Sequence, residues 1–341
     1  MVETDVHFPT DINLLFDSIR KVVTLISRLC GELDLKGWRN SADNIKKVKK
    51  LFHKARKLKH SHSKDDVKMV QKKEQIKKAH LAYICLVEFY LDRTDYILDE
   101  LKKRGSLGMV ALIRILEIEG YIDHAYRQID QIRRRVINDE SIPHNEKVFS
   151  IFEEHTEWIS KGKAGVPQEL GLKVCILEDQ YGFILHHRVM QEESDDKVAV
   201  VMVMETKQKY SNLRSCSFDK GFHSPSNQKR LRELLDFVIL PKKGKLSKSD
   251  KLLEHSEEFI AGRNNHSAVE SAINGLENHG LDRCLDHGLD GFKRYVSFAV
   301  LARNIEKLGA LIRKQKIKSL KGKKKHKLLR GGVCLEKLKA A

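Results

Sequence analysis

The feature that most constrains the fold is a change in hydrophobic period near residue 165. From Thr10 to about Ser160, apolar residues recur at helical spacing, as in DINLLFDSIRKVVTLISRL. Thr10 stands where the N-cap of this first helix would lie. Because few prolines interrupt the region, residues 10–165 are predicted to form a helical bundle with short connections.

Beyond residue 165 the pattern is that of short strands alternating with helices. The stretch LGLKVCILEDQYGFILHHRVM has two apolar runs around Gln180 to Gly182, which predicts a β-hairpin. It is followed by helix SDDKVAVVMVMETKQKY, strand LRSCSFD, helix SPSNQKRLRELL and strand DFVILP. The order β-β-α-β-α-β predicts an α/β domain, residues 166–312, with helices on the faces of a mixed sheet.

The charge is high and unevenly distributed. The formal net charge is +17, and Lys36 to His80 holds 16 Lys and Arg against 4 Asp and Glu. Residues 313–341 form a basic, low-complexity tail that is predicted to be disordered. A near-neutral body with two basic regions favours a polyanionic partner, nucleic acid first, although a merely soluble basic surface explains the charge equally well.

The cysteines and the hydropathy favour a cytoplasmic protein. The six cysteines are scattered without a C-x-x-C pair, which is typical of reduced thiols. No signal peptide is evident, and no apolar run approaches the roughly 20 residues that span a bilayer. We therefore expect no membrane association.

Two carboxylates are candidates for chemistry. Asp219 ends an apolar strand, the place where α/β sheets position active sites, although a turn-capping Asp would look the same. Glu270 shares a helix face with His266, Ile273 and Glu277, which could also be a plain exposed acidic stripe. Two carboxylates that converge at a sheet edge would suit Mg²⁺ in phosphodiester chemistry, but no obvious third carboxylate accompanies them.

A family resemblance gives these residues a role. The stretches FEEHTEWISKGKAG, ELGLKVCILEDQYGFILHHRVM, LRSCSFDKGFHSPSNQ, VILPKKGK, HSAVESAINGLENHGLDRCLDHGLDGFKRYV and LARNIEKLG occur in order. Through them, residues 142–310 closely resemble DDE transposases of bacterial insertion sequences. The front end, VETDVHFPTDINLLFD, is also similar to this family. The resemblance covers nearly the whole chain apart from the tail.

The resemblance implies an RNase H-like fold with a large all-helical insertion after the first strand. Proteins of this family use an Asp-Asp-Glu triad and two Mg²⁺ ions, for which Mn²⁺ could substitute, to cut and rejoin DNA. The implied partner is double-stranded DNA, both transposon ends and target, bound by a homo-oligomer. The implied location is the bacterial cytoplasm, in association with the nucleoid.

Carried over residue by residue, the second Asp falls on Asp219 and the Glu on Glu270. Some related transposases show Tyr-x2-Arg-x3-Glu-x6-Lys around that Glu. The same spacing here reads Arg263, His266, Glu270 and Glu277, so only the Glu keeps its type, and we give no family role to the others.

The first Asp of the triad is expected outside this sequence. Residues 1–9 look like the remainder of the first, central strand, and the family pattern places its Asp about three residues upstream of Met1. Most of that strand would then be missing, as in a truncated transposase. Asp5 lies roughly eight residues past the expected place, about 25 Å if extended. Asp11 fits the first turn of the next helix, so we expect neither to substitute.

Basic side chains in two places are predicted to contact DNA phosphates. The first group lies in the basic segment of the helical domain and the second in the loop KKGK; together they are Lys46, Lys47, Lys49, Lys50, Lys54, Arg56, Lys57, Lys242, Lys243 and Lys245. A solvated helix face and a solvated loop are the plainer alternatives.

The sequence therefore favours a DDE transposase that nicks DNA and transfers strands. The alternative is a catalytically inactive remnant that binds DNA without cutting it, which the expected absence of one carboxylate supports. A helical scaffold or RNA-binding protein would explain the charge but not Asp219 at a strand end.

Overall fold

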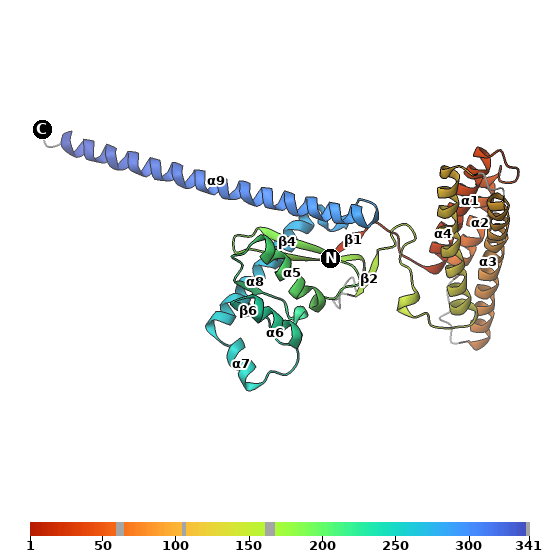
Figure 1. The fold of residues 1–341 in the computed structure, drawn as a ribbon, viewed down its shortest axis with the longest axis horizontal. Coiled ribbons are helices and arrows are strands. Elements are labelled where there is room, and N and C mark those ends of the chain that lie inside the picture. Colours follow the sequence, from red (N-terminus) through yellow and green to blue (C-terminus); the bar gives the residue numbers. More distant parts are fainter. Residues whose placement is uncertain (59–64, 104–106, 161–167, 339–341) are drawn as a thin grey trace. The chain divides into compact units, whose positions relative to one another are not determined.

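The chain forms two compact units, shown in the computed structural model in Figure 1. The structure describes residues 1–58, 65–103, 107–160 and 168–338, with no side chains described for 267, 268 and 321–338. One unit, here called the sheet unit, contains Met1–Asp5 and His155–Ala341. The helical unit is Val6–Glu154, so the chain leaves the sheet unit after Asp5 and returns to it at His155.

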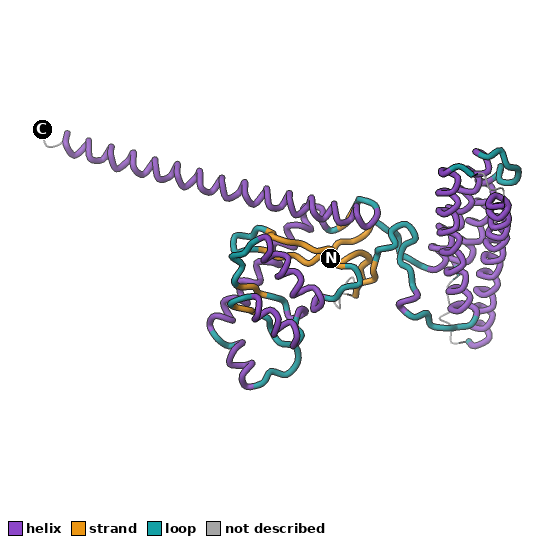
Figure 2. Tube along the Cα trace, in the orientation of Figure 1, coloured by secondary structure: helices purple, strands orange, loops and turns teal. Residues whose placement is uncertain are grey.

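The helical unit is built from four α-helices, which Figure 2 shows in purple. They are α1 (Asp11–Glu32), α2 (Ser41–Lys57), α3 (Asp66–Lys103) and α4 (Met109–Ile132). The predicted cap is confirmed, since the Thr10 hydroxyl accepts a hydrogen bond from the Asn13 backbone N–H at 3.3 Å. A π-helical turn, Arg133–Ile137, and a 3-10 turn, His144–Glu146, follow α4.

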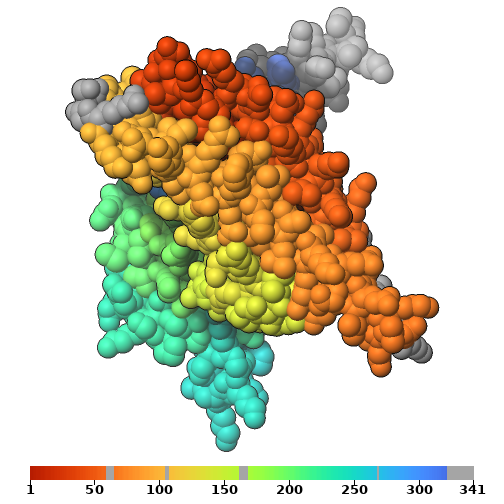
Figure 3. Space-filling view, turned by 90° about the vertical axis from the view of Figure 1, so that its right-hand side faces the viewer, coloured from red at the N-terminus to blue at the C-terminus, as the bar shows by residue number. Residues whose placement is uncertain are grey.

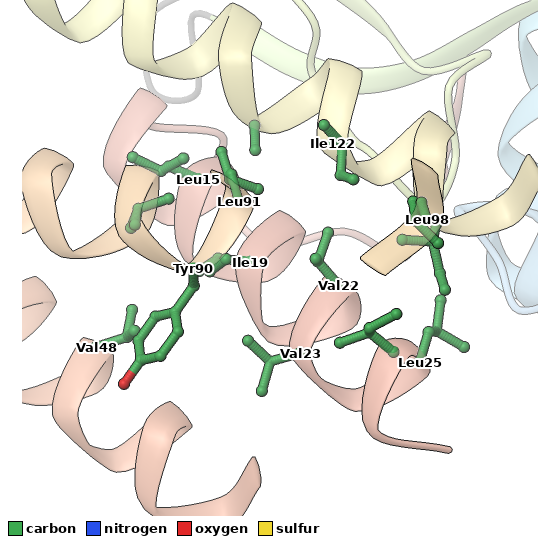
Figure 4. Packing of buried hydrophobic residues seen from close by; sticks show 14 of the residues in the cluster. Leu15, Ile19, Val22, Val23, Leu25, Val48, Tyr90, Leu91, Leu98 and Ile122 are labelled. Atoms are coloured by element: carbon green, nitrogen blue, oxygen red, sulfur yellow. The ribbon is translucent and has the colours of Figure 1, made fainter. Parts of the chain in front are cut away.

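The core of the helical unit is a continuous apolar cluster contributed by all four helices. Figure 4 shows part of it, with Ile19 and Val23 of α1, Val48 of α2 and Leu91 of α3 directed toward one another. Burial of such side chains contributes about 1.5–3 kcal/mol each. Figure 3 shows the outer surface of part of this unit, coloured from red to orange by position in the sequence.

Truncating one of these core residues should destabilise the helical unit. Leu91→Ala removes a side chain that is fully buried (0% exposed) in α3, and we expect a loss of about 2–5 kcal/mol from cavity formation. Leu81→Ala in the same helix is the matched control, since Leu81 is 39% exposed, and it should cost less than about 0.5 kcal/mol. Denaturant unfolding followed by helical circular dichroism measures both; equal losses would contradict this packing.

The sheet unit contains a mixed five-stranded sheet. Its members are β1 (Val2–Thr4), β2 (Glu157–Ser160), β3 (Gln168–Glu178), β4 (Ile184–Met190) and β7 (Arg283–Cys284). β3 lies at the centre and pairs antiparallel with β1, β2 and β4, whereas β1 and β7 are parallel.

The predicted hairpin is confirmed. β3 and β4 are joined at Asp179, whose backbone N–H donates to the Phe183 carbonyl at 2.9 Å. Gly182 has a φ of +84°, a left-handed conformation that glycine adopts without steric cost. The turn chemistry of this segment therefore fixes the register of the two long strands.

Strands β5 (Ser215–Ser217) and β6 (Phe237–Ile239) form a second, parallel sheet of two strands. The order of elements is the predicted β-β-α-β-α-β, with α5 (Asp195–Lys209) and α6 (Pro225–Leu234) as the intervening helices. The expected single sheet is instead two sheets, because no strand in the described part of the chain bridges β3 and β5. The coarse prediction, an α/β unit with a mixed sheet, is confirmed.

Helices cover β3 on both faces. Cys175 and Leu177 pack with Val198 and Met202 of α5. The alternate residues, Leu172, Val174 and Ile176, pack against a cluster that includes residues of α8 (Glu257–Leu276) and α9 (Gly288–Leu338). This period-2 alternation follows from strand geometry and defines an α5 face and an α8 face.

The boundary between the helical and sheet units lies earlier in the chain than the sequence suggests. The helical unit ends at Glu154, before the boundary expected at 165, because β2 pairs with β3 and so belongs to the sheet unit.

Helix α7 (Lys248–Glu254) lies in the loop after β6, and α9 continues to Leu338, through the segment for which the sequence predicts a disordered tail. Within the described residues, no helix combines the length and the apolar character needed to cross a bilayer.

Candidate functional site

Asp219 follows directly on the carboxyl end of β5. The strand ends at Ser217, Phe218 donates its backbone N–H to the Ile239 carbonyl at 2.9 Å, and the chain turns into a short 3-10 helix, Lys220–Phe222. Asp219 caps this turn, since its Oδ1 accepts from the Lys220 N–H at 2.7 Å. The side chain is exposed, so the turn role leaves the other carboxylate oxygen facing solvent.

Glu270 is an exposed residue of α8. His266, one helical turn before it, contacts β5. His266 Nδ1 lies 3.1 Å from the Ser217 hydroxyl, a hydrogen bond that joins α8 to the strand carrying Asp219. Residues at i and i+4 share a helix face, with a rise of about 6 Å between them. Glu270 thus lies one turn from β5, on the side that contacts Ser217.

The side chains of Ser217 and Asp219 lie on the same face of the chain, because they are two residues apart on an extended segment. Asp219 thus follows β5 directly, and α8, the helix that carries Glu270, contacts the same strand through His266. No group of three or more His, Cys, Asp or Glu side chains that could hold a metal ion occurs among the residues that the structure describes. Asp219 and Glu270 by themselves would be a partial donor set for a hard cation.

Neither possible substitute for a third carboxylate lies at this place. Asp5 pairs with Arg283 of β7 at 3.3 Å. Asp11 belongs to the helical unit, where it is buried and pairs with Arg135 at 2.8 Å. Burial raises the pKa of the Asp11 carboxyl above its usual value, against the lowering effect of Arg135. Asp5 thus pairs the segment after β1 with β7, and Asp11 pairs the start of α1 with the π-helical turn after α4.

The basic loop after β6 is ordered by its own contacts. Lys242 Nζ lies 2.5 Å from Asp250 Oδ2, and this hydrogen bond, with those from Ser247, keeps the pKa of the Asp250 carboxyl below its usual value. Lys243 Nζ donates to the Gly221 carbonyl at 2.7 Å, beside the Asp219 turn. Lys245 is exposed. Of the three predicted DNA contacts in this loop, Lys242 is occupied by an acidic partner and Lys243 lies next to the candidate site.

The predicted basic residues of the helical unit all lie on the exposed surface of α2. They are Lys46, Lys47, Lys49, Lys50, Lys54, Arg56 and Lys57. Within the described parts of the chain none of them forms an ion pair, while Val48, Phe52 and Ala55 of the same helix are buried. The helix thus presents an unneutralised basic surface opposite its apolar stripe.

Two contacts of the site were missed by the sequence reasoning. The Ser217–His266 hydrogen bond and the Lys243–Gly221 hydrogen bond each join segments far apart in the chain. Glu178 was also missed: it is half-buried at the end of β3, where burial raises the pKa of its carboxyl despite the nearby Lys307 and Arg303. A charged residue at the end of an apolar strand was the available signal for Glu178.

Close approach of α8 to β6 positions the His266 turn. A Cβ added at Gly262 would lie 2.5 Å from Ile239 Cδ1 and 2.7 Å from its Cγ1. We expect Gly262→Ala to destabilise the sheet unit by about 1–2 kcal/mol, since the overpacking outweighs the gain in helix propensity. Adding Ile239→Val, which deletes the nearest atom, should recover part of the loss. Denaturant unfolding of both variants measures this coupling, and a neutral Gly262→Ala would contradict the close approach.

No protein-family model, no curated protein and no solved structure matches this chain.

Proposed function

We propose that this chain is a DDE-type transposase that acts on double-stranded DNA by strand cleavage and strand transfer. The observation that carries the proposal is an exposed Asp directly after the carboxyl end of β5, a strand that contacts α8, the helix that carries Glu270. Asp219 and Glu270 come from segments far apart in the chain, and the Ser217–His266 hydrogen bond, which joins these two segments, supports the proposal that the two carboxylates act together. Active sites of α/β proteins form at strand ends of this kind.

The fold that goes with this proposal is an RNase H-like sheet with a helical insertion. It is supported by the antiparallel β3–β4 hairpin followed by α5, β5, α6 and β6, with β5 and β6 parallel. It is also supported by the path of the chain, which forms β1, then the helical unit, and then the rest of the sheet unit. In the same proposal the protein acts as a homo-oligomer that holds two DNA ends, in association with the bacterial nucleoid.

Asp219 and Glu270 are the residues that would hold Mg²⁺, or Mn²⁺ in its place. Carboxylates are the ligands that Mg²⁺ prefers, and it binds through one or two of them together with water and substrate phosphate. Two such ions would activate the attacking oxygen and stabilise the leaving oxygen of a phosphodiester. The chain's own contribution would be to hold Asp219 through the Lys220 N–H, to join α8 to β5 through the Ser217–His266 hydrogen bond, and to supply Lys243, which bonds to the Gly221 carbonyl beside the Asp219 turn.

The basic surface of α2 would supply non-specific DNA affinity. Lys and Arg that contact phosphates position the duplex without reading its sequence. Because these side chains lie in the helical unit and the carboxylates in the sheet unit, DNA binding and cleavage should respond separately to mutation.

The test is nicking of supercoiled plasmid DNA by the full chain, in Mg²⁺ and in EDTA. The proposal predicts relaxed plasmid only with Mg²⁺, and no relaxed plasmid with the Asp219→Asn variant. Nicking that persists in that variant would identify a contaminating nuclease.

A second function is favoured by one observation, the absence of any three-residue metal-binding group within the described ranges. In that case the chain is an inactive transposase remnant that binds DNA through α2 without cutting it. It would retain DNA at low salt and leave the plasmid supercoiled with Mg²⁺ present.

A further inference from the structure

The outer face of α9 carries a regular apolar stripe. Its five large side chains recur at alternating spacings of three and four residues, and each is between 43% and 63% exposed: Phe298, Leu301, Ile305, Leu308 and Ile312. This set is here called the α9 stripe. Alternating spacings of three and four residues mark the a and d positions of a heptad repeat, so the five side chains form one seam along the helix.

The α9 stripe lies opposite the face of α9 that packs on the sheet. Phe292, Val296 and Val300 of this helix are buried in the cluster that also contains Leu172 of β3 and Ile184 of β4. With 3.6 residues per turn, the centre of the stripe lies roughly 160° around the helix from these three residues. The sheet unit therefore holds α9 by one face and leaves the stripe exposed on the other.

The second half of α9 has no apolar support from the sheet unit. In the part of the chain that the structure describes, no α9 residue after Val300 belongs to an apolar cluster. Figure 1 shows the helix continuing past the strands of the sheet. Helices without tertiary contacts are marginal in water, and most helical stability in proteins comes from packing of an apolar face. The α9 stripe is the face that such packing would use.

A helix with the same repeat is the partner that fits this seam. In a coiled coil each a or d side chain inserts between four residues of the facing helix, which requires matching heptads on both helices. A second copy of α9 supplies matching heptads by symmetry. A two-fold dimer also uses one and the same surface on both copies, as a single stripe requires.

The area of the stripe is sufficient for a dimer. Fully exposed large apolar residues present roughly 150–200 Å² each, so five that are about half exposed leave roughly 400–500 Å² per copy. A patch of this size is among the largest that monomeric proteins expose. Two copies would bury roughly 800–1000 Å² through the stripe alone, and flanking side chains would bring the total above the ~1000 Å² that marks a specific interface.

The charge on α9 decides the orientation of the two helices. From Arg313 to Arg330 the sequence holds 10 Lys and Arg and no Asp or Glu. A parallel pair would place two such segments side by side, where like charges repel. An antiparallel pair instead sets each basic segment toward the first turns of the other α9, where Asp290 is exposed, and it also opposes the two helix dipoles.

An antiparallel pair has a defined register, because a positions then face d positions. Setting Phe298 opposite Leu308 of the second copy also sets Leu301 opposite Ile305 of the second copy. The two-fold axis repeats both contacts, which gives four apolar layers from four side chains of each copy.

The residues that flank the seam agree with this register. It brings Lys318 of one copy opposite Asp290 of the other, which pairs opposite charges at both ends. It also brings Gly309 opposite Tyr295, a small residue against a large one. Gly309 has room for a partner side chain, since a Cβ added there would meet no atom within 4 Å.

We propose that the α9 stripe is a dimerisation surface, and that its occupant is the α9 stripe of a second copy of this chain, packed antiparallel with Leu301 opposite Ile305. The inference goes beyond the proposed function, since the dimer forms without DNA and rests on the α9 pattern alone. A dimer that nicks no plasmid would contradict the proposed function only, and plasmid nicking by a monomer would contradict this inference only.

Sedimentation equilibrium of the full chain without DNA tests the surface, in about 0.5 M salt, where contaminating nucleic acid is released. We expect a dimer with a dissociation constant on the order of micromolar. Leu301→Glu with Ile305→Glu places charges inside the seam and should weaken the dimer at least about a hundredfold. Leu252→Glu with Leu285→Glu, at exposed positions elsewhere in the sheet unit, is the matched control and should stay dimeric. A monomeric wild-type chain, or equal dimerisation of the two double variants at equal helix content, would overturn the proposal.

Cysteine cross-linking tests the orientation. A Leu301→Cys chain and an Ile305→Cys chain, mixed in equal amounts and oxidised by dissolved oxygen, should form a disulfide between position 301 of one copy and position 305 of the other. Neither chain alone should cross-link at its new cysteine, because like positions of an antiparallel pair lie one helical turn apart. Peptide mapping separates the new disulfide from any that involve the native cysteines. Cross-links between like positions, or none in the mixture, would overturn the antiparallel dimer.

Discussion

Asp219→Asn and Glu270→Gln should each abolish plasmid nicking by the full chain, with a loss of at least about a hundredfold. Each change keeps the shape of the side chain and removes one negative charge. An isosteric amide is a poorer ligand for a hard cation than a carboxylate. Each 1.36 kcal/mol lost from transition-state stabilisation lowers the rate tenfold, so loss of one ligand contact worth about 3 kcal/mol is sufficient.

Matched controls separate this effect from a general change in charge. Asp236→Asn and Glu233→Gln alter exposed carboxylates of the same sheet unit, and Asp236 only pairs with Arg214 at the surface. Both controls should nick at the wild-type rate. The assignment would be wrong if the controls lost as much activity as the site variants, or if the site variants kept theirs while remaining folded by circular dichroism.

Replacing Lys46, Lys49, Lys50 and Lys57 together by Ala should weaken binding to duplex DNA on the order of a thousandfold at about 0.1 M salt. Each phosphate contact contributes about 0.9 to the slope of log K against log salt, so the slope should fall by about 3 to 4. The four side chains are exposed on α2, and Ala is a strong helix former, so the helical unit should stay folded.

The control removes lysines of the same unit that already have acidic partners. Lys73, Lys102 and Lys103 pair with Asp139, Glu119 and Glu100, so their removal changes net charge without removing an unneutralised surface. We expect at most about a tenfold loss of affinity and little change in slope for this triple variant. Equal losses in the two variants would mean that overall charge, and not the α2 surface, binds DNA.

Much of the fold could be predicted where local chemistry decides it. The β3–β4 hairpin follows from two apolar runs around a glycine turn, and Gly182 does adopt the left-handed backbone of that turn. The start of α1 follows from Thr10, whose hydroxyl caps the helix. Such features depend on residues a few positions apart, so the sequence alone contains the information.

The parts that escaped prediction depend on long-range pairing. β2 and β7 have four and two residues, too few to show a period, and each is defined by its partner strand. The boundary at Glu154 could not be seen because it depends on β2 joining β3. The division into two sheets depends on whether a strand lies between β3 and β5, which no local pattern reports.

The candidate site was predictable only in its residue types. Asp219 could be found because it ends an apolar strand, and Glu270 because it shares a helix face with His266, Ile273 and Glu277; the family resemblance then implied a role for both. The position of α8 against the two-stranded sheet depends on two contacts between distant segments. Gly262 packs against Ile239 of β6, and His266 forms a hydrogen bond with Ser217 of β5. Likewise, the pairing of Lys242 with Asp250 gives this lysine an acidic partner that composition cannot reveal.

The most direct test of the account is retention of double-stranded DNA by the unmodified full chain, measured by filter binding between about 50 and 200 mM salt. Contact by six or more basic side chains predicts strong retention at the lower salt and an affinity about a thousandfold weaker at the higher salt. Failure to retain DNA at the lower salt would contradict both the transposase and its DNA-binding remnant.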